Sequence, residues 1–271
     1  MNIQTILLPA LRQIRSEAPL VHCVTNPISI GNCANLVLCL GASPIMAEHP
    51  EETAEITAQA RALLLNLGNL TQARAQAMRN SAASARERGL PCVLDLVGVG
   101  CSRLRLDLAE DLIRTARPAL LKGNESEIRA MCGLPHHAKG IDSGERGDLA
   151  EAARAVALAA EKYGCAVLLS GAADVIAGGG KTLAAENGHP IMARVTGTGC
   201  MLGAAAAVLL TALPPLEGAA AAACLMGAAG EHAARRYRED LRISQVPGHM
   251  LDALDRFEAL DLAAGLRCRT L

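Results

Sequence analysis

The chain has 271 residues, a formal net charge of −1 and 51% hydrophobic residues, which is enough apolar material for one large α/β domain or two ordinary ones. We favour a single domain spanning residues 1–271. Its 26 Lys and Arg are balanced by 27 Asp and Glu, and its aromatic residues are one Phe and two Tyr. Nucleic-acid-binding proteins rely on clustered basic residues and aromatic faces, so we expect no nucleic-acid partner.

Apolar runs and helical patterns alternate along the chain after an N-terminal amphipathic helix over residues 1–15. Strands are expected at 20–24, 63–67, 91–96, 119–122 and 166–170. Helices are expected at 28–40, 50–60, 71–88, 103–116, 124–132 and 146–163, and the chain is mainly helical from Gly199 onward, with further helices at 216–239 and 246–264. This alternation predicts an α/β fold with a mostly parallel sheet and helices on both faces.

Polar residues follow the expected strands, at the edge where open parallel sheets bind ligands. Asn26 follows the first strand, although it precedes a proline and capping that turn is an equally good interpretation. Asp95 follows a buried strand and needs a cation or hydrogen-bond donors, so a hydrated metal ion is a candidate partner. Lys122 and Ser170 end two further strands.

Asn124 and Glu127 allow two interpretations. Asn124 can cap the next helix with Glu127 at its third position, and this approximates a capping box that explains Glu127 without chemistry. Alternatively, Lys122, Asp95 and a glycine-rich helix start suit a magnesium nucleotide, because carboxylates hold the hydrated ion and cations meet phosphates.

Residues 194–201, RVTGTGCM, run directly into a strongly helical segment. The helix start predicts outward-pointing N–H groups at Gly197, Thr198, Gly199 and Cys200, which favour a phosphoryl group or an oxyanion. The same position would activate the Cys200 thiol as a base or nucleophile. A buried small residue after a glycine turn is the alternative for Cys200.

The ten cysteines are spread from Cys23 to Cys268 without a C-x-x-C pair. We expect most of them to be buried thiols of a cytoplasmic protein. The N-terminal helix does not resemble a cleavable signal, and the longest apolar stretch, 200–213, is too short to span a bilayer. We therefore expect no membrane association.

Five segments resemble the hydroxyethylthiazole kinase family in sequence, order and spacing: VHCVTN at 21–26, GASPIMA at 41–47, LNLGNLT at 65–71, LKGNESE at 121–127 and VTGTGC at 195–200. The resemblance extends to about Glu231. It implies a ribokinase-like three-layer α/β/α sandwich that phosphorylates the hydroxyl of 4-methyl-5-(2-hydroxyethyl)thiazole, with ATP as co-substrate and Mg²⁺ as cofactor, in thiamine biosynthesis or salvage. It also implies a homotrimer with active sites near the subunit interfaces.

The resemblance also assigns roles to residues. It implies that the thiazole contacts Met46, Asn26 and Gly197, and that the catalytic anion hole is formed by Gly197, Thr198, Gly199 and Cys200. It implies that ATP is bound by Lys122, Ser170 and Asn124. Asp95 and Glu127 would belong to the metal and phosphate site. Cys200 takes the place of an aspartate found in many related kinases. Lysine and serine stand at 122 and 170 where the family usually has arginine and threonine.

Other departures from the family pattern are Leu96 in place of proline, Asn69 in place of threonine, and PGHM at 247–250 in place of a Gly-Ser-Phe sequence. They support one alternative, a non-catalytic thiazole or nucleotide sensor.

Other enzyme classes are also candidates. Hydroxymethylpyrimidine kinases share the G-T-G-C turn, and only the segments 21–26 and 41–47 distinguish this sequence from theirs. Hydrate dehydratases generally carry aspartate in that turn. A cysteine hydrolase would pair Cys200 with His22 or His189. His136 and His137 are expected in an exposed loop.

Overall fold

The structure of the chain is a computed structural model that describes residues 2–135, 148–237 and 241–271. His136 and His137 lie outside the described residues. Within the described ranges, nine strands form one sheet in the order β2-β1-β3-β4-β5-β6-β7-β8-β9. The strands are β1 (Leu20–Val24), β2 (Ser43–Ile45), β3 (Ala62–Asn66), β4 (Cys92–Asp95), β5 (Leu120–Asn124), β6 (Ala166–Ser170), β7 (Asp174–Gly178), β8 (Lys181–Ala185) and β9 (Cys268–Thr270).

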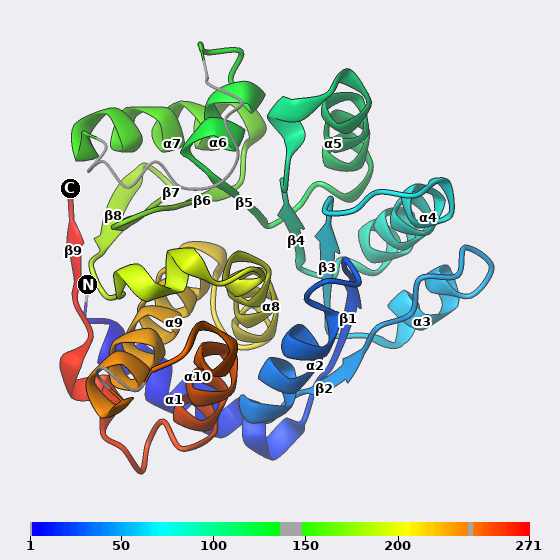
Figure 1. The fold of residues 1–271 in the computed structure, drawn as a ribbon. Coiled ribbons are helices and arrows are strands. Elements are labelled where there is room, and N and C mark those ends of the chain that lie inside the picture. The colour runs from blue at the N-terminus through cyan, green and yellow to red at the C-terminus, as the bar shows by residue number, and fades with distance from the viewer. Residues whose placement is uncertain (1, 136–147, 238–240) are drawn as a thin grey trace.

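Helices cover both faces of this sheet (Figure 1). One face carries α1 (Ile3–Glu17), α2 (Ile30–Cys39), α8 (Thr198–Leu209), α9 (Pro215–Tyr237) and α10 (Val246–Asp255), and the other carries α4 (Gln72–Arg88), α5 (Arg103–Ala116), α6 (Glu125–Met131) and α7 (Leu149–Tyr163). Helix α3 (Thr53–Gln59) packs on α4. This arrangement confirms the predicted three-layer α/β/α class.

Two hydrophobic cores lie on the two faces of the sheet, and successive strand residues alternate between them. In β3, Leu64 belongs to the core beneath α8 and α9, whereas Leu63 and Leu65 belong to the core beneath α4 and α5. This alternation follows from the two-residue period of a strand. Because both faces are buried, β3 is apolar throughout until Asn66, which explains why its sequence is a continuous run of aliphatic residues.

Strands β1 to β6 are parallel, whereas β7, β8 and β9 are antiparallel to their neighbours. The chain passes from β1 through α2 to β2 on one side, and β3 then pairs with β1 on its other side. The strand order therefore reverses between β1 and β3. Open α/β sheets bind their ligands at the carboxyl ends of the strands beside such a switch point.

The prediction that the chain is mainly helical from Gly199 onward is wrong in two places near the C-terminus. The helix predicted over 246–264 ends at Asp255 and is followed by a 3-10 turn at Leu262–Gly265, and the chain then adds β9 to the sheet edge. Strands β2, β7 and β8 were also not expected. Strand β2 has three residues and contains a proline, and β9 is a short, mostly exposed edge strand, so neither shows a hydrophobic period.

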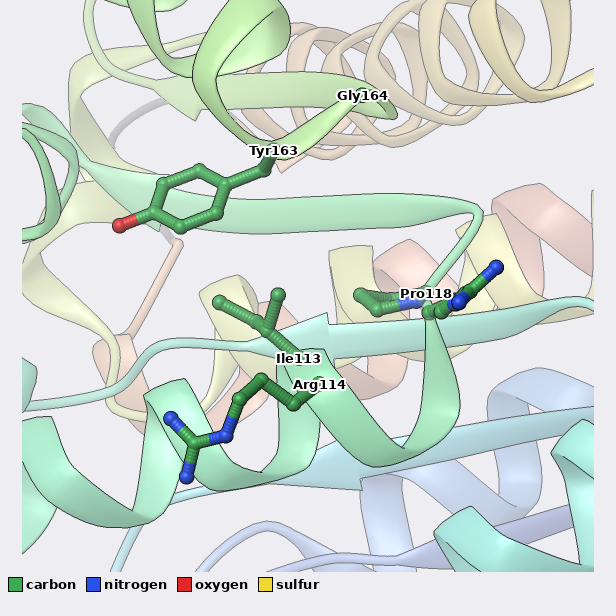
Figure 2. Close-up of a pocket in the computed structure, with 6 residues that line it drawn as sticks. Ile113, Arg114, Pro118, Tyr163 and Gly164 are labelled. Atoms are coloured by element: carbon green, nitrogen blue, oxygen red, sulfur yellow. The ribbon is translucent and has the colours of Figure 1, made fainter.

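A hollow of about 460 Å³ opens between the ends of α5 and α7, lined by Ile113, Arg114, Arg117, Pro118, Tyr163 and Gly164 (Figure 2). Pro118 and Gly164 precede β5 and β6, so this hollow lies at the amino ends of the strands. It is therefore at the opposite edge of the sheet from the predicted site residues. Among the described residues, none of the helices combines the length and apolarity needed to cross a membrane.

Candidate active site

The carboxyl ends of the parallel strands bring most of the predicted site residues to one edge of the sheet. Asn26 lies two residues beyond β1, Asp95 ends β4, Lys122 and Asn124 lie in β5, and Ser170 ends β6. Met46 directly follows the unexpected strand β2, which pairs in parallel with β1. Residues 197–200 begin α8, which packs against β1, β3 and β4 at this edge.

A continuous chain of hydrogen bonds joins Cys200 to Lys122 through buried side chains. Asn26 Nδ2 donates to Cys200 Sγ at 3.2 Å and to Asn66 Oδ1 at 3.1 Å. Asn66 Nδ2 then donates to Asp95 Oδ2 at 2.8 Å, and Lys122 Nζ donates to Asp95 Oδ1 at 3.1 Å. Asn66 and Asp95 are fully buried, and Asn26 and Lys122 are each 4% exposed. The structure therefore brings four predicted residues together, through one that was not predicted.

The ion pair between Asp95 and Lys122 is the strongest electrostatic feature of this edge. Burial raises the pKa of Asp95 to about 6, although the positive charge of Lys122 opposes this shift. Burial also disfavours the charged form of Lys122, but the carboxylates of Asp95 and Glu127 outweigh it and raise its pKa above the ordinary value. Burying two charges costs free energy that their attraction does not fully return, and such pairs concentrate at functional sites.

The start of α8 lies directly against this ion pair. Gly197 precedes the helix with φ = 97°, and the first intrahelical bond runs from Met201 N to Gly197 O at 2.9 Å. The N–H groups of Thr198, Gly199 and Cys200 thus come before the regular helical ladder. A Cβ atom on Gly199 would lie 3.1 Å from Lys122 Nζ, so the ammonium group stands beside the positive end of the helix.

Thr198 holds the turn before α8 in shape. Its hydroxyl shares its one proton between the carbonyl oxygens of Met192 and Val195, which lie 3.1 and 3.2 Å away. The hydroxyl is thus occupied within its own loop. The backbone N–H groups are the polar groups that the start of α8 can offer to a ligand. Any contribution of Thr198 to an anion site would come from its N–H group.

Asn124 and Glu127 form the predicted capping box. The Asn124 side chain accepts from Glu127 N at 2.9 Å, and Glu127 Oε2 accepts from Asn124 N at 2.7 Å. Glu127 Oε1 also accepts from Gly98 N at 2.8 Å, which ties the loop after β4 to α6. Both carboxylate oxygens therefore have structural partners. Ser170 Oγ donates to the neighbouring Gly123 carbonyl oxygen at 3.4 Å, so it extends the same edge by one strand.

Met46 is half-buried against the core beneath α1, α2 and α8. Its segment is held by two side chains that the sequence did not single out for this role. His22 Nε2 lies 2.9 Å from the carbonyl oxygen of Ala47, and the buried Arg74 pairs with Glu48 at 2.7 Å. Because a carbonyl oxygen only accepts, the neutral His22 ring carries its proton on Nε2. Nδ1 lies 2.8 Å from the Thr57 hydroxyl, which also lies 2.7 Å from the Thr53 carbonyl oxygen, so the one hydroxyl proton is shared between these two acceptors.

The two histidines considered as partners of Cys200 have other roles. His22 is buried between Thr57 and Ala47. His189 is exposed, and its Nδ1 accepts from Ile191 N at 3.2 Å at the start of a short 3-10 helix. The contact recorded for the Cys200 sulfur comes from the Asn26 amide. Neither of these two histidines is therefore hydrogen-bonded to the Cys200 thiol, as a base of a cysteine hydrolase would be.

The departures at Leu96 and Asn69 have local structural reasons. The Leu96 N–H donates to the Lys122 carbonyl oxygen at 2.8 Å, a bond that proline cannot form. Asn69 adopts φ = 46°, in the left-handed region that asparagine tolerates better than a β-branched residue. Residues 247–250 lie in the first half of α10, where Met250 is fully buried. None of these positions removes a polar group from the hydrogen-bonded chain.

Asn66 is the site residue that sequence reasoning missed. The signal was present, because an amide ends an otherwise aliphatic, fully buried strand beside the expected ligand edge. Its partners could not be inferred from the sequence, since they come from β1 and β4, which are far from it along the chain. In the part of the chain that the structure describes, no cluster of three or more His, Cys, Asp or Glu has the geometry of a metal site.

Comparison with known proteins assigns this arrangement to a family. Residues 11–259 match the model of the hydroxyethylthiazole kinase family. Hydroxyethylthiazole kinase 2 of Clostridium botulinum strain 657 is 42% identical over 225 residues, covering 81% of this chain and 85% of that relative. The structure of a hydroxyethylthiazole kinase from Pyrococcus horikoshii OT3 superposes with a TM-score of 0.88 at 31% identity, covering 98% of this chain and 99% of the other.

A more distant structure supports the fold alone. A ribokinase-like superfamily protein from Enterococcus faecalis V583 superposes with a TM-score of 0.61 at 18% identity, covering 90% of this chain and 89% of the other. The three-layer fold is thus ribokinase-like. The match to the family model, the identity to the curated relative and the structural superposition together show that this chain belongs to the hydroxyethylthiazole kinase family.

Proposed function

We propose that this member of the hydroxyethylthiazole kinase family transfers the γ-phosphoryl group of ATP in line to the hydroxyl oxygen of 4-methyl-5-(2-hydroxyethyl)thiazole. The observation that carries the proposal is the Lys122 ammonium beside the start of α8, where two sources of positive potential meet at the ligand edge of the sheet. Phosphoryl transfer proceeds through a loose transition state, so positioning and charge neutralisation supply most of the catalysis.

The N–H groups of residues 198–200 and the ammonium of Lys122 stabilise the transferring group in this proposal. Backbone N–H groups aimed at developing charge need no reorganisation during the reaction, which makes them effective in a site that excludes water. Ser170 and Asn124 line the nucleotide side, at the ends of β5 and β6. Asp95 keeps Lys122 in place through their direct hydrogen bond.

The acceptor side contains Asn26, Met46, Gly197 and Cys200. The Met46 thioether is a soft, polarisable surface suited to a sulfur heterocycle. The Cys200 sulfur accepts a hydrogen bond from Asn26 and orients the acceptor hydroxyl. In its thiolate form it would also take up the proton that this hydroxyl loses as the new O–P bond forms. This proton step is secondary, because the alcohol need not be ionised before a loose transition state is reached.

Magnesium would be held by its own waters, the ATP phosphates, Asp95 and Glu127. Within the described residues, each carboxylate oxygen of Asp95 and Glu127 accepts one hydrogen bond, and an oxygen with two lone pairs can also accept from a metal-bound water. Mg²⁺ commonly binds in this manner, with one or two carboxylates and substrate phosphates. When bound, the ion would neutralise phosphate charge, while the protein groups orient its hydration shell.

A direct assay tests this function. Purified protein is mixed with ATP, Mg²⁺ and hydroxyethylthiazole, and the phosphorylated thiazole is measured by mass spectrometry. Parallel reactions with hydroxymethylpyrimidine and pyridoxal test the other acceptors that a ribokinase-like fold accommodates. We expect turnover of the thiazole with a kcat/KM at least tenfold above that of either alternative; binding without turnover would instead identify a sensor.

We also propose a cytoplasmic homotrimer built as a single domain over residues 1–271. Its support is the single sheet that runs from β2 to β9, ten free thiols, and two exposed apolar side chains, Ile28 just before α2 and Leu38 near its end, which are 68% and 57% exposed. Sedimentation equilibrium of the Leu38→Lys variant tests the interface. The matched control is Leu104→Lys on the remote helix α5, where the leucine is 69% exposed.

A further inference from the structure

Asn66 lies between the two halves of the site. It ends β3 at the switch point of the sheet and is fully buried. We call Asn26 and Cys200 the acceptor half, and Asp95 and Lys122 the phosphate half. The Asn66 side chain contacts both halves, since it accepts from Asn26 Nδ2 at 3.1 Å and donates to Asp95 Oδ2 at 2.8 Å.

We propose that Asn66 is a positioning residue that fixes the acceptor half of the site relative to the phosphate half. This inference rests on the proposed kinase function. Asn66 does not touch the reacting atoms in this assignment, and it acts through Asn26 and Asp95. In-line transfer requires the acceptor oxygen and the phosphoryl group to be aligned, and a misplacement of about 1 Å can cost about 100-fold in rate.

The hydrogen bonds allow one orientation of the Asn66 amide. Its oxygen faces two donors, Asn26 Nδ2 and the N–H of Gly68 at 2.9 Å, whereas its nitrogen faces the Asp95 carboxylate. A flipped amide would place its NH₂ group against those donors and its oxygen against a carboxylate. The bridge therefore has a fixed direction, because the amide accepts through its oxygen on one side and donates through its nitrogen on the other.

The surroundings of Asn66 leave little room for adjustment. A Cβ atom on Gly68 would lie 2.8 Å from Asn66 Oδ1 and 2.9 Å from Asn26 Nδ2, so the Gly68 backbone covers the pair of asparagines directly. The Asn26 oxygen is held as well, because it accepts from the N–H groups of Ile28 and Ser29 at 3.1 and 3.2 Å. The Asn26 amide that reaches Cys200 is thus fixed at both ends.

Two substitutions separate the two contacts of Asn66. Asn66→Asp keeps the shape and the oxygen that accepts from Asn26 and Gly68, but it replaces the neutral NH₂ donor with a carboxyl group that repels the Asp95 carboxylate when ionised and donates to it only while the two share a proton. Asn66→Ser is too short to reach either half. Asn187→Ser is the matched control, because Asn187 is 5% exposed and follows β8, far from the site along the sheet. It also bridges two segments, since it accepts from Arg267 N at 2.7 Å and donates to Glu231 Oε2 of α9 at 3.4 Å.

The measurements are kcat, the KM values for thiazole and for ATP, and the melting temperature. We expect Asn66→Asp to lower kcat about 10- to 100-fold and to raise the KM for ATP, with the KM for thiazole less affected. Asn66→Ser should lower kcat and raise both KM values. The control should lose melting temperature while keeping kcat within about twofold, since purely structural bonds act on stability.

The proposal is overturned if both Asn66 variants keep the wild-type kcat and lose only melting temperature, as the control does. Should neither variant be folded at the assay temperature, Gly68→Ala replaces them, because its methyl group presses on both asparagines without removing a polar group; a wild-type kcat in that variant also overturns the proposal. Failure of the proposed function has a different signature, since the wild-type protein itself would then not phosphorylate the thiazole.

Discussion

At the scale of single residues, the proposed mechanism has Cys200 assist the reaction rather than carry it. Its sulfur accepts from Asn26, while the N–H groups of the same helix start are independent of its side chain. General-base assistance contributes about 10²- to 10⁴-fold in enzymes that use it. Electrostatic stabilisation by the backbone would survive loss of the thiol.

We therefore expect Cys200→Ala to lower kcat within that range and to leave phosphorylation that a discontinuous assay can measure. Cys200→Asp should remain active, because aspartate stands at this position in related kinases by the resemblance described above. Circular dichroism confirms folding of each variant. A folded alanine variant with no activity would show that the thiol is obligatory, and a folded but inactive aspartate variant would contradict the assigned role.

His22, which contacts the segment that carries Met46, makes the stability of the folded protein depend on pH. Burial lowers its pKa below the ordinary value of 6.5, and the backbone bond to Ala47 and the charge of Glu52 only partly oppose this shift. As pH falls below about 6.5, the unfolded chain takes up the proton before the folded one does. The folded state therefore loses stability toward the folded-state pKa, and regains it as pH rises.

The expected result is a steeper fall in the free energy of unfolding between pH 7.5 and 5.5 for the wild type than for His22→Gln. Urea denaturation at a series of pH values measures it. The variant removes the titrating ring but leaves Glu52 and every other acid in place, so the difference between the two curves isolates His22. Parallel curves would mean that this histidine has the same pKa in both states.

At the scale of elements, the start of α8 depends on a glycine that no other residue replaces without strain. Gly197 has φ = 97°, and a Cβ atom there would lie 3.0 Å from Ser29 Cβ. Substitution would shift the turn that carries the N–H groups of residues 198–200. The Asn26 loop would move with it, because Ser29 N donates to Asn26 Oδ1.

We expect Gly197→Ala to lower kcat by at least about tenfold, since displaced oxyanion donors cost about 10² to 10³ in other enzymes. Gly179→Ala is the control, because Gly179 also has positive φ (57°) but has nothing within 4 Å of its Cβ position. Both variants should lose about 1 kcal/mol or more of stability from backbone strain. Equal kcat values in the two variants would show that the N–H groups at the start of α8 do not contribute to catalysis.

The long elements were predictable and the short ones were not. Strands β1 and β6 and helix α5 have the predicted bounds, because continuous apolar runs and capped amphipathic periods mark them. The β7–β8 hairpin turns at Gly179 and Gly180, both with positive φ, a signal for a hairpin that the glycine-rich sequence did carry. Strands β2 and β9 instead depend on pairing partners distant in sequence, which no local pattern contains.

The same distinction applies to the site. Strand-end residues such as Asp95 and Lys122 could be proposed from the sequence, because topology alone puts them at one edge. Their direct pairing, and the amide of Asn66 that connects them to Asn26 and Cys200, depend on strand register. Asn66 pairs with Asp95, and Asp95 with Lys122, across neighbouring strands, so the register that buries the leucines also aligns the polar residues.

At the scale of the whole molecule, stability and chemistry are concentrated at different parts of the sheet. The candidate active site lies at the carboxyl ends of strands β1 to β6, whereas the C-terminal segment closes the opposite side by pairing β9 with β8. That side is held by a compact polar cluster in which Glu231 accepts from Gly188 N at 2.9 Å and pairs with Arg267. Nothing in this cluster contacts the hydrogen-bonded chain from Cys200 to Lys122.

Removal of residues 268–271 should therefore destabilise the protein without changing its chemistry. The truncation deletes the β8–β9 ladder, including the bond from Leu271 N to Thr182 O at 3.0 Å, and exposes the edge of β8. With each backbone bond contributing about 1 kcal/mol net, we expect a loss of about 1 to 3 kcal/mol in the free energy of unfolding. Measured well below the melting temperature, kcat should stay within about twofold of the wild type, because the site and its supporting strands remain intact.

Arg269→Ser provides the matched control, since it breaks only the ion pair with Glu186, whose side chains are 53% and 39% exposed. Exposed pairs of this kind contribute about 0 to 1 kcal/mol, so the control should be nearly as stable as the wild type. A truncated protein that unfolds normally in urea but has lost its kcat would contradict this division, because it would mean that the far edge of the sheet holds the catalytic strands in register.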